Sequence, residues 1–437
     1  MNPFVDELQK TDIPNRIKGL ETKVFSDVID IEGYQYVDLI LEGPGNASIA
    51  LCGYTYVLEQ CGIRFFNLAG SSSGALNAVM LAALQEGYST KSEKLASILY
   101  KTDLSTWQDN DRYIKWLLNK LSSNAKMKSL FLLLSIGDLL KILNKKHGLS
   151  STANLEKWLS KELNKLGINT ISDLEIRRKR LAEDLRLRSG ENYLFEKAQL
   201  SIIAADITTR TKAIFPKMAS LYWQDPDLMK PSQIICAAMA TPYLFYPYEI
   251  KPIPAAQHNG KLFIDSNINI TERISQQEFQ ETLPDKFRFV DAGVFSNFPA
   301  NHFHRKDGLL PRKPSFGVRT SVSSGKHNDK SDIADYCINI TDTFREINDQ
   351  EFLHRNPDYE QLITKINPPK DLHTFEFNLT ESQKAALFLA GAKAAINFLE
   401  RFNWGLYKDT RSITLSRINP LAYMNGVDVF RLYNIPN

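Results

Sequence analysis

Short apolar runs, each followed by a turn and then by a helical repeat, shape the first part of the chain. Residues 36–41 (YVDLIL) and 63–68 (IRFFNL) have the length and the β-branched and aromatic content of buried strands. Segments at about 49–60 and 75–86 follow them and have the spacing of helices. Strand, helix, strand and helix with short connections predict a parallel sheet covered by helices.

One long stretch interrupts this pattern. Residues 90–199 are mostly helical in their spacing, and strand-like runs return only at 200–207 and 287–290. Near the C-terminus, residues 380–402 predict a strong helix, because a threonine and a glutamine at capping-box spacing precede an interior rich in alanine and leucine.

The chain of 437 residues is two to three times the usual length of a domain, yet no repeat or low-complexity linker divides it. We therefore expect a single elaborated domain. Its expected parts are an N-terminal extension at 1–33, a core at 34–300 that carries the helical insertion at about 90–199, and a C-terminal part at 301–437 packed on the core.

Composition and charge narrow the class of protein. The chain is 43% hydrophobic and 24% charged, which is typical of folded proteins and excludes disordered and collagen-like chains. Its 53 basic and 50 acidic residues give a net charge of only +3, so no nucleic-acid partner is expected. The four cysteines stand singly, without the spacing of a disulfide scaffold or a zinc site, which favours a reducing compartment.

The N-terminal sequence MNPFVDELQK is acidic where a Sec-type signal peptide would be basic, so no such signal is expected. The longest apolar stretch, 130–143, contains Asp138 and Lys141 and is shorter than the roughly 20 residues that a membrane-spanning helix needs. We therefore expect a cytoplasmic location or a peripheral contact with a membrane.

Residues 126–146, from Lys126 to Lys146, are the segment through which such a contact would occur. Their leucines and isoleucines fall at helical spacing, with polar residues mostly opposite and lysines at both ends. The segment is either an interfacial helix on anionic lipid or an ordinary core helix, and the sequence leaves both open. The basic run at 177–180 has acidic residues interleaved nearby, so we expect it on a solvated helix face rather than on phosphate groups.

The sequence Gly70-Ser71-Ser72-Ser73-Gly74 carries the first candidate for chemistry, since it fits the pattern GxSxG. In that pattern the central serine, here Ser72, stands on a tight turn between a strand and a helix, and Gly70 and Gly74 make room for the turn. A strand-like run enters the motif and a small-residue helix leaves it, and helix N-terminal amides favour a developing oxyanion. The alternative is a serine- and glycine-rich turn without chemistry.

Two more elements stand at the ends of predicted strands. Gly43-Pro44-Gly45-Asn46 follows the first strand, where glycines let backbone N–H groups converge on an anionic oxygen. Because the carboxyl ends of parallel strands meet at one sheet edge, this loop is a candidate oxyanion hole for Ser72. Asp291-Ala292-Gly293 ends the run at 287–290, and its aspartate can approach a serine closely or form a simple Asx turn.

These three elements, in this order, resemble the patatin-like phospholipase family, whose pattern is a glycine-rich oxyanion loop, a GxSxG serine and an Asp-Gly aspartate. The resemblance extends to 204–209 (AADITT) and 236–242 (CAAMATP), and it covers about residues 36–300. It implies a three-layer α/β/α fold with a mostly parallel central sheet and a helical insertion.

The resemblance also implies a function. Asp291 would accept the proton of Ser72, the serine would attack a fatty-acyl ester, and water would then release the acid from an acyl-enzyme. The chain would thus be a serine lipid acyl hydrolase of the phospholipase A or lysophospholipase type, acting on a membrane phospholipid or lysolipid. No cofactor or metal is implied, and His302 and His304 stand in HxH spacing without a third ligand.

The glycine-rich loop departs from the family pattern. Pro44, Ala47 and Ser48 replace a glycine, the basic residue and the last glycine. Proline has no N–H, so the donors of the hole would come from Gly43, Gly45, Asn46 and Ser73. The loss of one donor typically lowers the rate by about 100-fold, so we expect weakened activity or dependence on an activator whose nature the sequence does not show.

Two other interpretations stay open. One is a catalytically silent lipid-binding or regulatory protein on the same scaffold, which the altered loop favours. The other is an α/β-hydrolase esterase with a Ser–His–Asp triad, in which His302, His304 or His327 would be the base. Against the triad, the serine motif follows the glycine-rich loop by only one helix, which is too early for the α/β-hydrolase fold.

Overall fold

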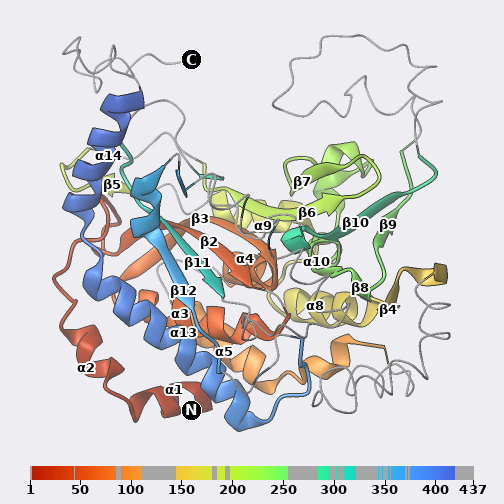
Figure 1. Ribbon diagram of the computed structural model, residues 1–437, viewed down its shortest axis with the longest axis horizontal. Coiled ribbons are helices and arrows are strands. Elements are labelled where there is room, and N and C mark those ends of the chain that lie inside the picture. The colour runs from red at the N-terminus through yellow and green to blue at the C-terminus, as the bar shows by residue number, and fades with distance from the viewer. Residues whose placement is uncertain are drawn as a thin grey trace.

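The structure is a computed structural model. It describes residues 2–43, 45–84, 90–109, 144–179, 185–191, 197–253, 284–294, 302–303, 310–320, 356–369 and 375–418, together with 343, 347, 353–354 and 372. Within these residues a central sheet, most of whose strands are parallel, packs against helices (Figure 1). The prediction of an α/β protein with a mostly parallel central sheet is confirmed.

The parallel half of the sheet contains the first predicted strands. In spatial order its strands are β12 (Ile363–Ile366), β11 (Ser315–Thr320), β2 (Gln35–Gly43), β3 (Ile63–Ser72) and β6 (Leu200–Asp206). Every residue of β2 and β3 is buried, which explains why both appear in the sequence as nearly continuous apolar runs. Both strands are longer than predicted, and β3 extends into the GxSxG motif as far as its central serine, Ser72.

Beyond β6 the sheet is antiparallel. There β10 (Phe287–Asp291) pairs with β6, and β9 (Tyr248–Ile250) pairs with β10. β7 (Thr211–Phe215) returns along β6 as a hairpin. At the other end of the strands, β1 (Val28–Ile29) pairs with β2 and with β5 (Arg186–Leu187). The strand that ends at Asp291 therefore runs in the opposite direction to the strand that ends at Ser72.

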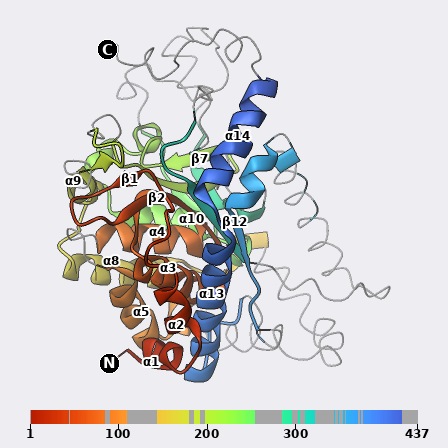
Figure 2. The ribbon, with the colours of Figure 1, turned by 90° about the vertical axis from the view of Figure 1, so that its left-hand side faces the viewer.

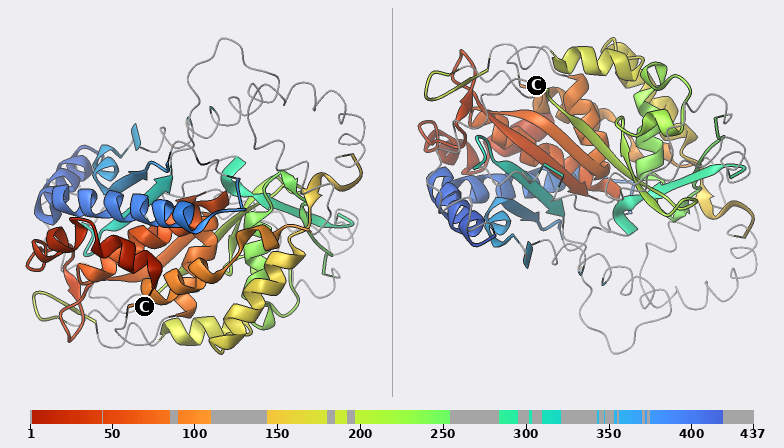
Figure 3. Two further views of the ribbon diagram at one scale, coloured as in Figure 1. Left: turned by 90° about the horizontal axis from the view of Figure 1, so that it is seen from below. Right: turned by 90° about the horizontal axis from the view of Figure 1, so that it is seen from above.

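One main core joins the sheet to several helices, among them α3 (Ser48–Gln60), α4 (Ser73–Ala83), α10 (Pro231–Met239) and α13 (Glu381–Arg401). Seen from above, the strands lie in front of α3 and α4 (Figure 3, right). α13 is the helix predicted near the C-terminus, and both arms of its capping box form between Thr380 and Gln383.

α13 packs directly on α3, backbone against backbone. A Cβ atom placed on Gly53 of α3 would lie 2.0 Å from the carbonyl oxygen of Phe388. A Cβ atom on Gly391 of α13 would lie 1.7 Å from the carbonyl oxygen of Ala50. Only glycine at these two positions lets the helices come so close.

The first 33 residues, which show no clear periodicity in sequence, pack on this same core. They form α1 (Pro3–Gln9) and α2 (Ile13–Lys18), and Figure 2 shows both beside α13. Phe4 and Leu8 are buried, and the ring of Phe4 stacks on Phe388 with 4.9 Å between centroids. Helices of seven and six residues are too short to show a helical repeat of apolar positions.

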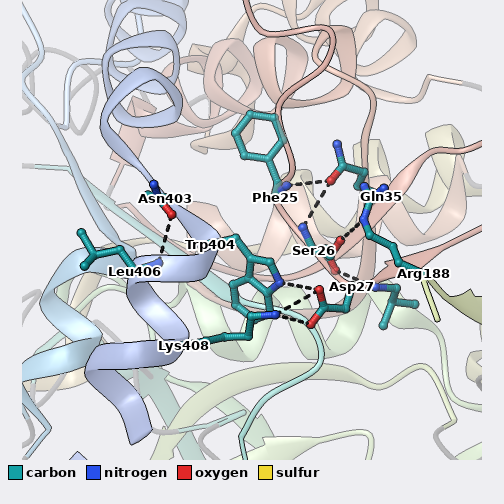
Figure 4. A network of polar contacts seen from close by, with 10 residues as sticks. Phe25, Ser26, Asp27, Gln35, Arg188, Asn403, Trp404, Leu406 and Lys408 are labelled. Atoms are coloured by element: carbon teal, nitrogen blue, oxygen red, sulfur yellow. Dashed lines mark hydrogen bonds and ion pairs between the residues drawn. The ribbon is translucent and has the colours of Figure 1, made fainter. Parts of the chain in front are cut away.

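Asp27 ties this N-terminal segment to the last described helix, α14 (Trp404–Ile418), as Figure 4 shows. Its Oδ1 accepts a hydrogen bond from Trp404 Nε1 at 2.9 Å, and its Oδ2 pairs with Lys408 Nζ at 2.9 Å. α14 also packs against the 3₁₀ helix η8 (Pro357–Leu362), where Arg411 forms a buried ion pair with Asp358. Asp27, Trp404 and Lys408 also help to line a pocket, and none of the predicted site residues lines it.

The described part of the insertion is mostly helical, with short strands that the sequence did not predict. Its elements are α5 (Ser92–Lys101), the 3₁₀ helix η2 (Leu104–Trp107), β4 (Gly148–Ser150), α8 (Ala153–Lys165), α9 (Ile171–Lys179) and the strand β5 described above. β4 forms a separate two-stranded parallel sheet with β8 (Tyr243–Phe245), which follows α10. Four single-turn 3₁₀ helices, Gly45–Ala47, Ala219–Leu221, Pro226–Leu228 and Ala292–Val294, complete the elements of the described residues.

The expectation that the basic run at 177–180 forms a solvated helix face is wrong for Arg178, whereas Arg177 is partly exposed and Lys179 is exposed. Arg178 is only 2% exposed, and its guanidinium donates to the carbonyl oxygens of Phe66 and Gln199. Arg177 donates to the carbonyl of Leu166 at 2.8 Å. A guanidinium carries five N–H donors in a planar fork, which lets it bind more than one backbone carbonyl at once.

The predicted interfacial segment lies mostly outside the described residues. Only 144–146 of the segment from Lys126 to Lys146 are described, and they end a helix just before β4. Both interpretations of that segment, interfacial helix or core helix, therefore stay predictions. Among the described helices, none is long and apolar enough to cross a membrane.

Candidate active site

Ser72 stands at the turn between β3 and α4. Its backbone has φ 52° and ψ −130°, and α4 begins at the next residue. A residue with a side chain is strained at positive φ, and such strain persists mainly where the surrounding structure enforces it. The serine is 1% exposed. This is the geometry of a nucleophile elbow, in which a strand passes sharply into a helix.

The two glycines of the motif are required because neither position has space for a Cβ atom. A Cβ atom on Gly70 would lie 2.3 Å from the carbonyl oxygen of Gly74. A Cβ atom on Gly74 would lie 2.2 Å from the carbonyl oxygen of Leu41 on β2. Side chains at either position would push the elbow away from the sheet, so the predicted role of Gly70 and Gly74 agrees with their surroundings.

The glycine-rich loop lies next to the elbow. Gly43, the last residue of β2, is the register partner of Ser72 in the parallel β2–β3 pair. Gly45 has φ 56° and opens the turn that leads into α3. The amino ends of α3 and α4 therefore start beside each other, and both direct N–H groups toward the carboxyl end of the sheet.

Two side chains of α4 fasten the glycine-rich loop to the elbow. Ser73 Oγ donates a hydrogen bond to the carbonyl oxygen of Gly45. Asn77 Nδ2 donates to the carbonyl oxygen of Ser48 at 2.9 Å. The sequence singled out Ser73 for its backbone N–H alone, so the structure adds a second use for this residue, which holds the loop in place.

The oxyanion-hole donors stay a prediction. The candidate N–H groups are those of Gly43, Gly45, Asn46 and Ser73, and Pro44 lies outside the described residues. The side chain of Asn46 is turned toward another part of the chain, since its Nδ2 donates to the carbonyl oxygen of Glu376 at 2.9 Å. If Asn46 serves the hole, it does so through its backbone.

The sheet brings Asp291 to the level of Ser72. Asp291 is the register partner of Ala204 on β6, and Ser71 is the register partner of Ile203 on the other side of the same strand. The serine and the aspartate thus flank β6 at neighbouring positions, although 219 residues separate them in sequence. Asp291 is 3% exposed, so its carboxylate is largely shielded from water.

The hydrogen bonds of Asp291 include contacts to its side chain and to its backbone. Its Oδ1 accepts from the N–H of Gly293 at 2.9 Å, and its Oδ2 accepts from Thr241 Oγ1 at 3.0 Å. Its own N–H donates to the carbonyl oxygen of Ala240 at 3.0 Å. The turn after α10 therefore contacts both the backbone and the side chain of Asp291. Sequence reasoning missed the role of Thr241, whose only signal is its place in the segment 236–242.

The aspartate of the AADITT segment, Asp206, has a different task. Its Oδ1 accepts from the N–H of Thr208 at 2.9 Å, and its Oδ2 accepts from Thr209 Oγ1 at 2.7 Å and from the Tyr222 hydroxyl at 3.2 Å. These bonds close the turn of the β6–β7 hairpin. Asp206 is therefore a structural residue.

His302 forms a hydrogen bond with a serine other than Ser72. Its Nε2 lies 2.6 Å from Ser201 Oγ on β6. Burial, together with the positive charges of Lys212 and Lys217, lowers the pKa of His302 to about 4. His304 and His327, the other candidate bases of a triad, lie outside the described residues. Among the described residues, no group of three or more His, Cys, Asp or Glu side chains forms a metal site.

An elbow serine beside a glycine-rich loop, with an aspartate brought to the same level of the sheet, defines a class of α/β hydrolytic site. A sequence model of the patatin-like phospholipase family matches residues 39–304. That range is more than half of the chain, and it contains the loop, the elbow and Asp291. The chain therefore belongs to the patatin-like phospholipase family, which is a family of lipid hydrolases.

Three proteins illustrate the similarity. The chain is 25% identical over 370 residues to the uncharacterized protein YqhO of Bacillus subtilis (strain 168). The matched region covers 84% of this chain and 100% of YqhO. The crystal structure of VipD from Legionella pneumophila is similar with a TM-score of 0.39 and 13% identity, over 87% of this chain and 71% of VipD. The type III effector protein ExoU is similar with a TM-score of 0.35 and 13% identity, over 84% of this chain and 53% of ExoU.

Proposed function

We propose that the chain is a serine lipid acyl hydrolase of the phospholipase A or lysophospholipase type, with Ser72 and Asp291 as its catalytic dyad. The observation that carries the proposal is the backbone of Ser72, which is held at positive φ between two glycines that have no room for a side chain. Such strain at a strand-to-helix turn is a feature of nucleophilic serines. The family supports a lipid as the substrate.

In the proposed reaction Asp291 takes the proton of the Ser72 hydroxyl while Ser72 Oγ bonds to the carbonyl carbon of a fatty-acyl ester. The carbonyl oxygen becomes an oxyanion that backbone N–H groups of the loop and of α4 stabilise. The intermediate then breaks its bond to the alcohol of the lipid, which leaves with the proton from Asp291. A water molecule, activated by the same carboxylate, releases the fatty acid from Ser72.

The test is the release of fatty acid from a panel of diacyl phospholipids and lysophospholipids by the wild type and by Ser72→Ala. We expect Ser72→Ala to lower the rate by at least about 1,000-fold, because removal of a nucleophile abolishes the covalent route. Ser201→Ala is the matched control, since it removes the hydroxyl next to His302, and its rate is expected to stay within a few-fold of the wild type.

Labelling by a long-chain fluorophosphonate separates the alternatives. A wild type that is labelled at Ser72 and releases fatty acid supports the proposal. A folded wild type with neither property would indicate the catalytically silent scaffold. If Asp291→Asn retained activity while variants of His302, His304 and His327 lost it, the dyad would be replaced by a triad.

A further inference from the structure

The carboxylate of Asp291 is oriented by two hydrogen bonds of different origin. The bond from the N–H of Gly293 comes from two residues away and would form in any Asx-type turn at this point. The bond from Thr241 comes from a residue 50 positions earlier in the chain and reaches the other carboxylate oxygen. A carboxylate fixed at both oxygens has a defined rotation about its last side-chain bond, whereas one fixed at a single oxygen does not.

The position of Thr241 is itself well determined. Its N–H donates to the carbonyl oxygen of Met239 at 2.7 Å, and its carbonyl oxygen accepts from the N–H of Phe245 at 2.8 Å. The adjacent carbonyl oxygen, that of Ala240, accepts from the N–H of Asp291. The turn at 239–241 is therefore held at both ends and in contact with the backbone of β10, so the threonine hydroxyl meets the carboxylate in a fixed place.

The next strand strengthens this arrangement. Thr241 leads through Pro242 into β8, which pairs in register with β4 of the insertion, Gly148 opposite Tyr243 and Ser150 opposite Phe245. A Cβ atom on Gly148 would lie 2.3 Å from the carbonyl oxygen of Phe245, so the two strands are in close contact. Tyr243 keeps φ 68°, a strained value for a residue with a large side chain.

We propose that Thr241 is a positioning residue of the catalytic site, which aims Asp291 at Ser72 by donating its hydroxyl hydrogen bond to Oδ2. The inference rests on the proposed function, since it assigns Asp291 the role of base. A donated hydrogen bond also favours the ionised carboxylate, the form that accepts the proton of the serine. In this role Thr241 acts through Asp291 and takes no part in the bond changes itself.

The experiment compares Thr241→Val, which keeps the shape of the side chain and removes the hydroxyl, with Thr241→Ser, which keeps the hydroxyl. We expect Thr241→Val to lower kcat about tenfold or more, with little change in KM, because a hydrogen bond to a charged group is lost at the base and not at the lipid. The acid limb of its pH–rate profile should move to higher pH. Thr241→Ser should restore most of the rate and the profile.

Thr209→Val is the matched control. Thr209 Oγ1 also donates to an aspartate, Asp206 Oδ2 at 2.7 Å, but in the β6–β7 turn. Its variant should keep the kcat and the pH profile of the wild type. Equal kinetics for Thr241→Val and wild type, or an equal loss in both valine variants, would overturn the inference. Should Thr241→Val not fold, Thr241→Ala serves in its place with the same expectation.

The two proposals fail in different ways. A wild type that releases no fatty acid and is not labelled at Ser72 would overturn the proposed function, and the role of Thr241 with it. A wild type that is active and labelled, beside a Thr241→Val that is equally active at every pH, would overturn the role of Thr241 alone.

Discussion

Ser72 and Asp291 are held in the site by different means. The serine depends on its backbone: the elbow is fixed because Gly70 and Gly74 leave no space between β3, α4 and β2. The aspartate depends on side-chain and backbone hydrogen bonds from a turn that lies 50 residues earlier in the chain. Both residues are nearly fully buried.

This difference decides which substitutions each region tolerates. We call the elbow at 70–74 with its neighbouring strand the serine half, and Asp291 with the turn at 239–241 the aspartate half. Close contacts between backbone atoms leave little room for adjustment, so the serine half should respond to an added atom by losing stability. Hydrogen bonds are directional and individually modest, so the aspartate half should respond to a change by losing alignment while it stays folded. We therefore expect the serine half to keep one geometry, whereas the geometry of the aspartate half can change on substitution.

The largest effect that follows from this comparison is expected at Gly74. The added Cβ atom of Gly74→Ala would stand 2.2 Å from the carbonyl oxygen of Leu41, so the strand or the helix must shift. We expect the free energy of unfolding to fall by about 3 kcal/mol, measured by urea denaturation.

Gly405→Ala is the control for that substitution. It lies in the first turn of α14, where a new Cβ would come no closer than 3.4 Å to a neighbouring atom. Its stability should equal or slightly exceed that of the wild type. If Gly74→Ala proved as stable as Gly405→Ala, the claim that backbone contact fixes the serine half would be wrong.

A smaller effect is expected from acid, through His302, which lies beside Ser201 on the strand between the two halves. The pKa of His302 is lowered to about 4 in the folded protein, from the ordinary value of 6.5. Between those values the unfolded chain binds the proton better than the folded one, so the stability that neutral His302 provides is present above pH 6.5 and is lost as the pH falls toward 4.

We expect wild type to lose about 2 kcal/mol of unfolding free energy through this group between pH 7 and pH 4.5. His302→Gln should show a correspondingly smaller loss over the same range, measured by urea denaturation at each pH. Lys212 and Lys217, which also face the imidazole, keep their charge throughout this range and leave the direction unchanged. An identical pH dependence in both proteins would show that His302 does not contribute.

The smallest effect concerns the strain at Ser72 itself. Both Ser72→Ala and Ser72→Gly remove the nucleophile, but only glycine adopts φ 52° without strain. We expect Ser72→Gly to be about 1 kcal/mol more stable than Ser72→Ala, since the relief of strain exceeds the entropic cost of glycine. Urea denaturation of the two variants side by side provides the measurement. Equal stability would mean that the elbow is not strained.

The sequence predicted the serine half better than the aspartate half, and the reason is physical. Everything that shapes the elbow lies within 70–74 and the strand beside it, and the parallel pairing of β2 with β3 brings the end of β2 beside the motif. A register shift between Val37 and Leu39, which the sequence did not predict, makes Gly43 the partner of Ser72. By contrast, the antiparallel direction of β10 and the contact between Thr241 and Asp291 arise from packing between distant segments. No local pattern encodes them.

Other misses have the same cause. Arg178 belongs to a charged run that has the composition of a solvated surface, yet it is buried and its guanidinium donates to the carbonyl oxygens of Phe66 and Gln199. Phe4 lies in a segment without periodicity, yet it stacks on Phe388 from the other end of the chain. Local spacing predicts elements and turns, whereas the partners of buried polar groups are decided only in the folded state.

The backbone contact between α3 and α13 sets the order in which the site can be completed during synthesis. Ser72 and Asp291 leave the ribosome well before α13, which begins only at Glu381. Until then α3, which directly follows the glycine-rich loop, lacks the helix against which Gly53 packs. The nascent chain thus contains every residue of the predicted site before it contains α13, the helix that supports α3 and the loop before it. We therefore expect the site to reach its final geometry only after α13 has been synthesised.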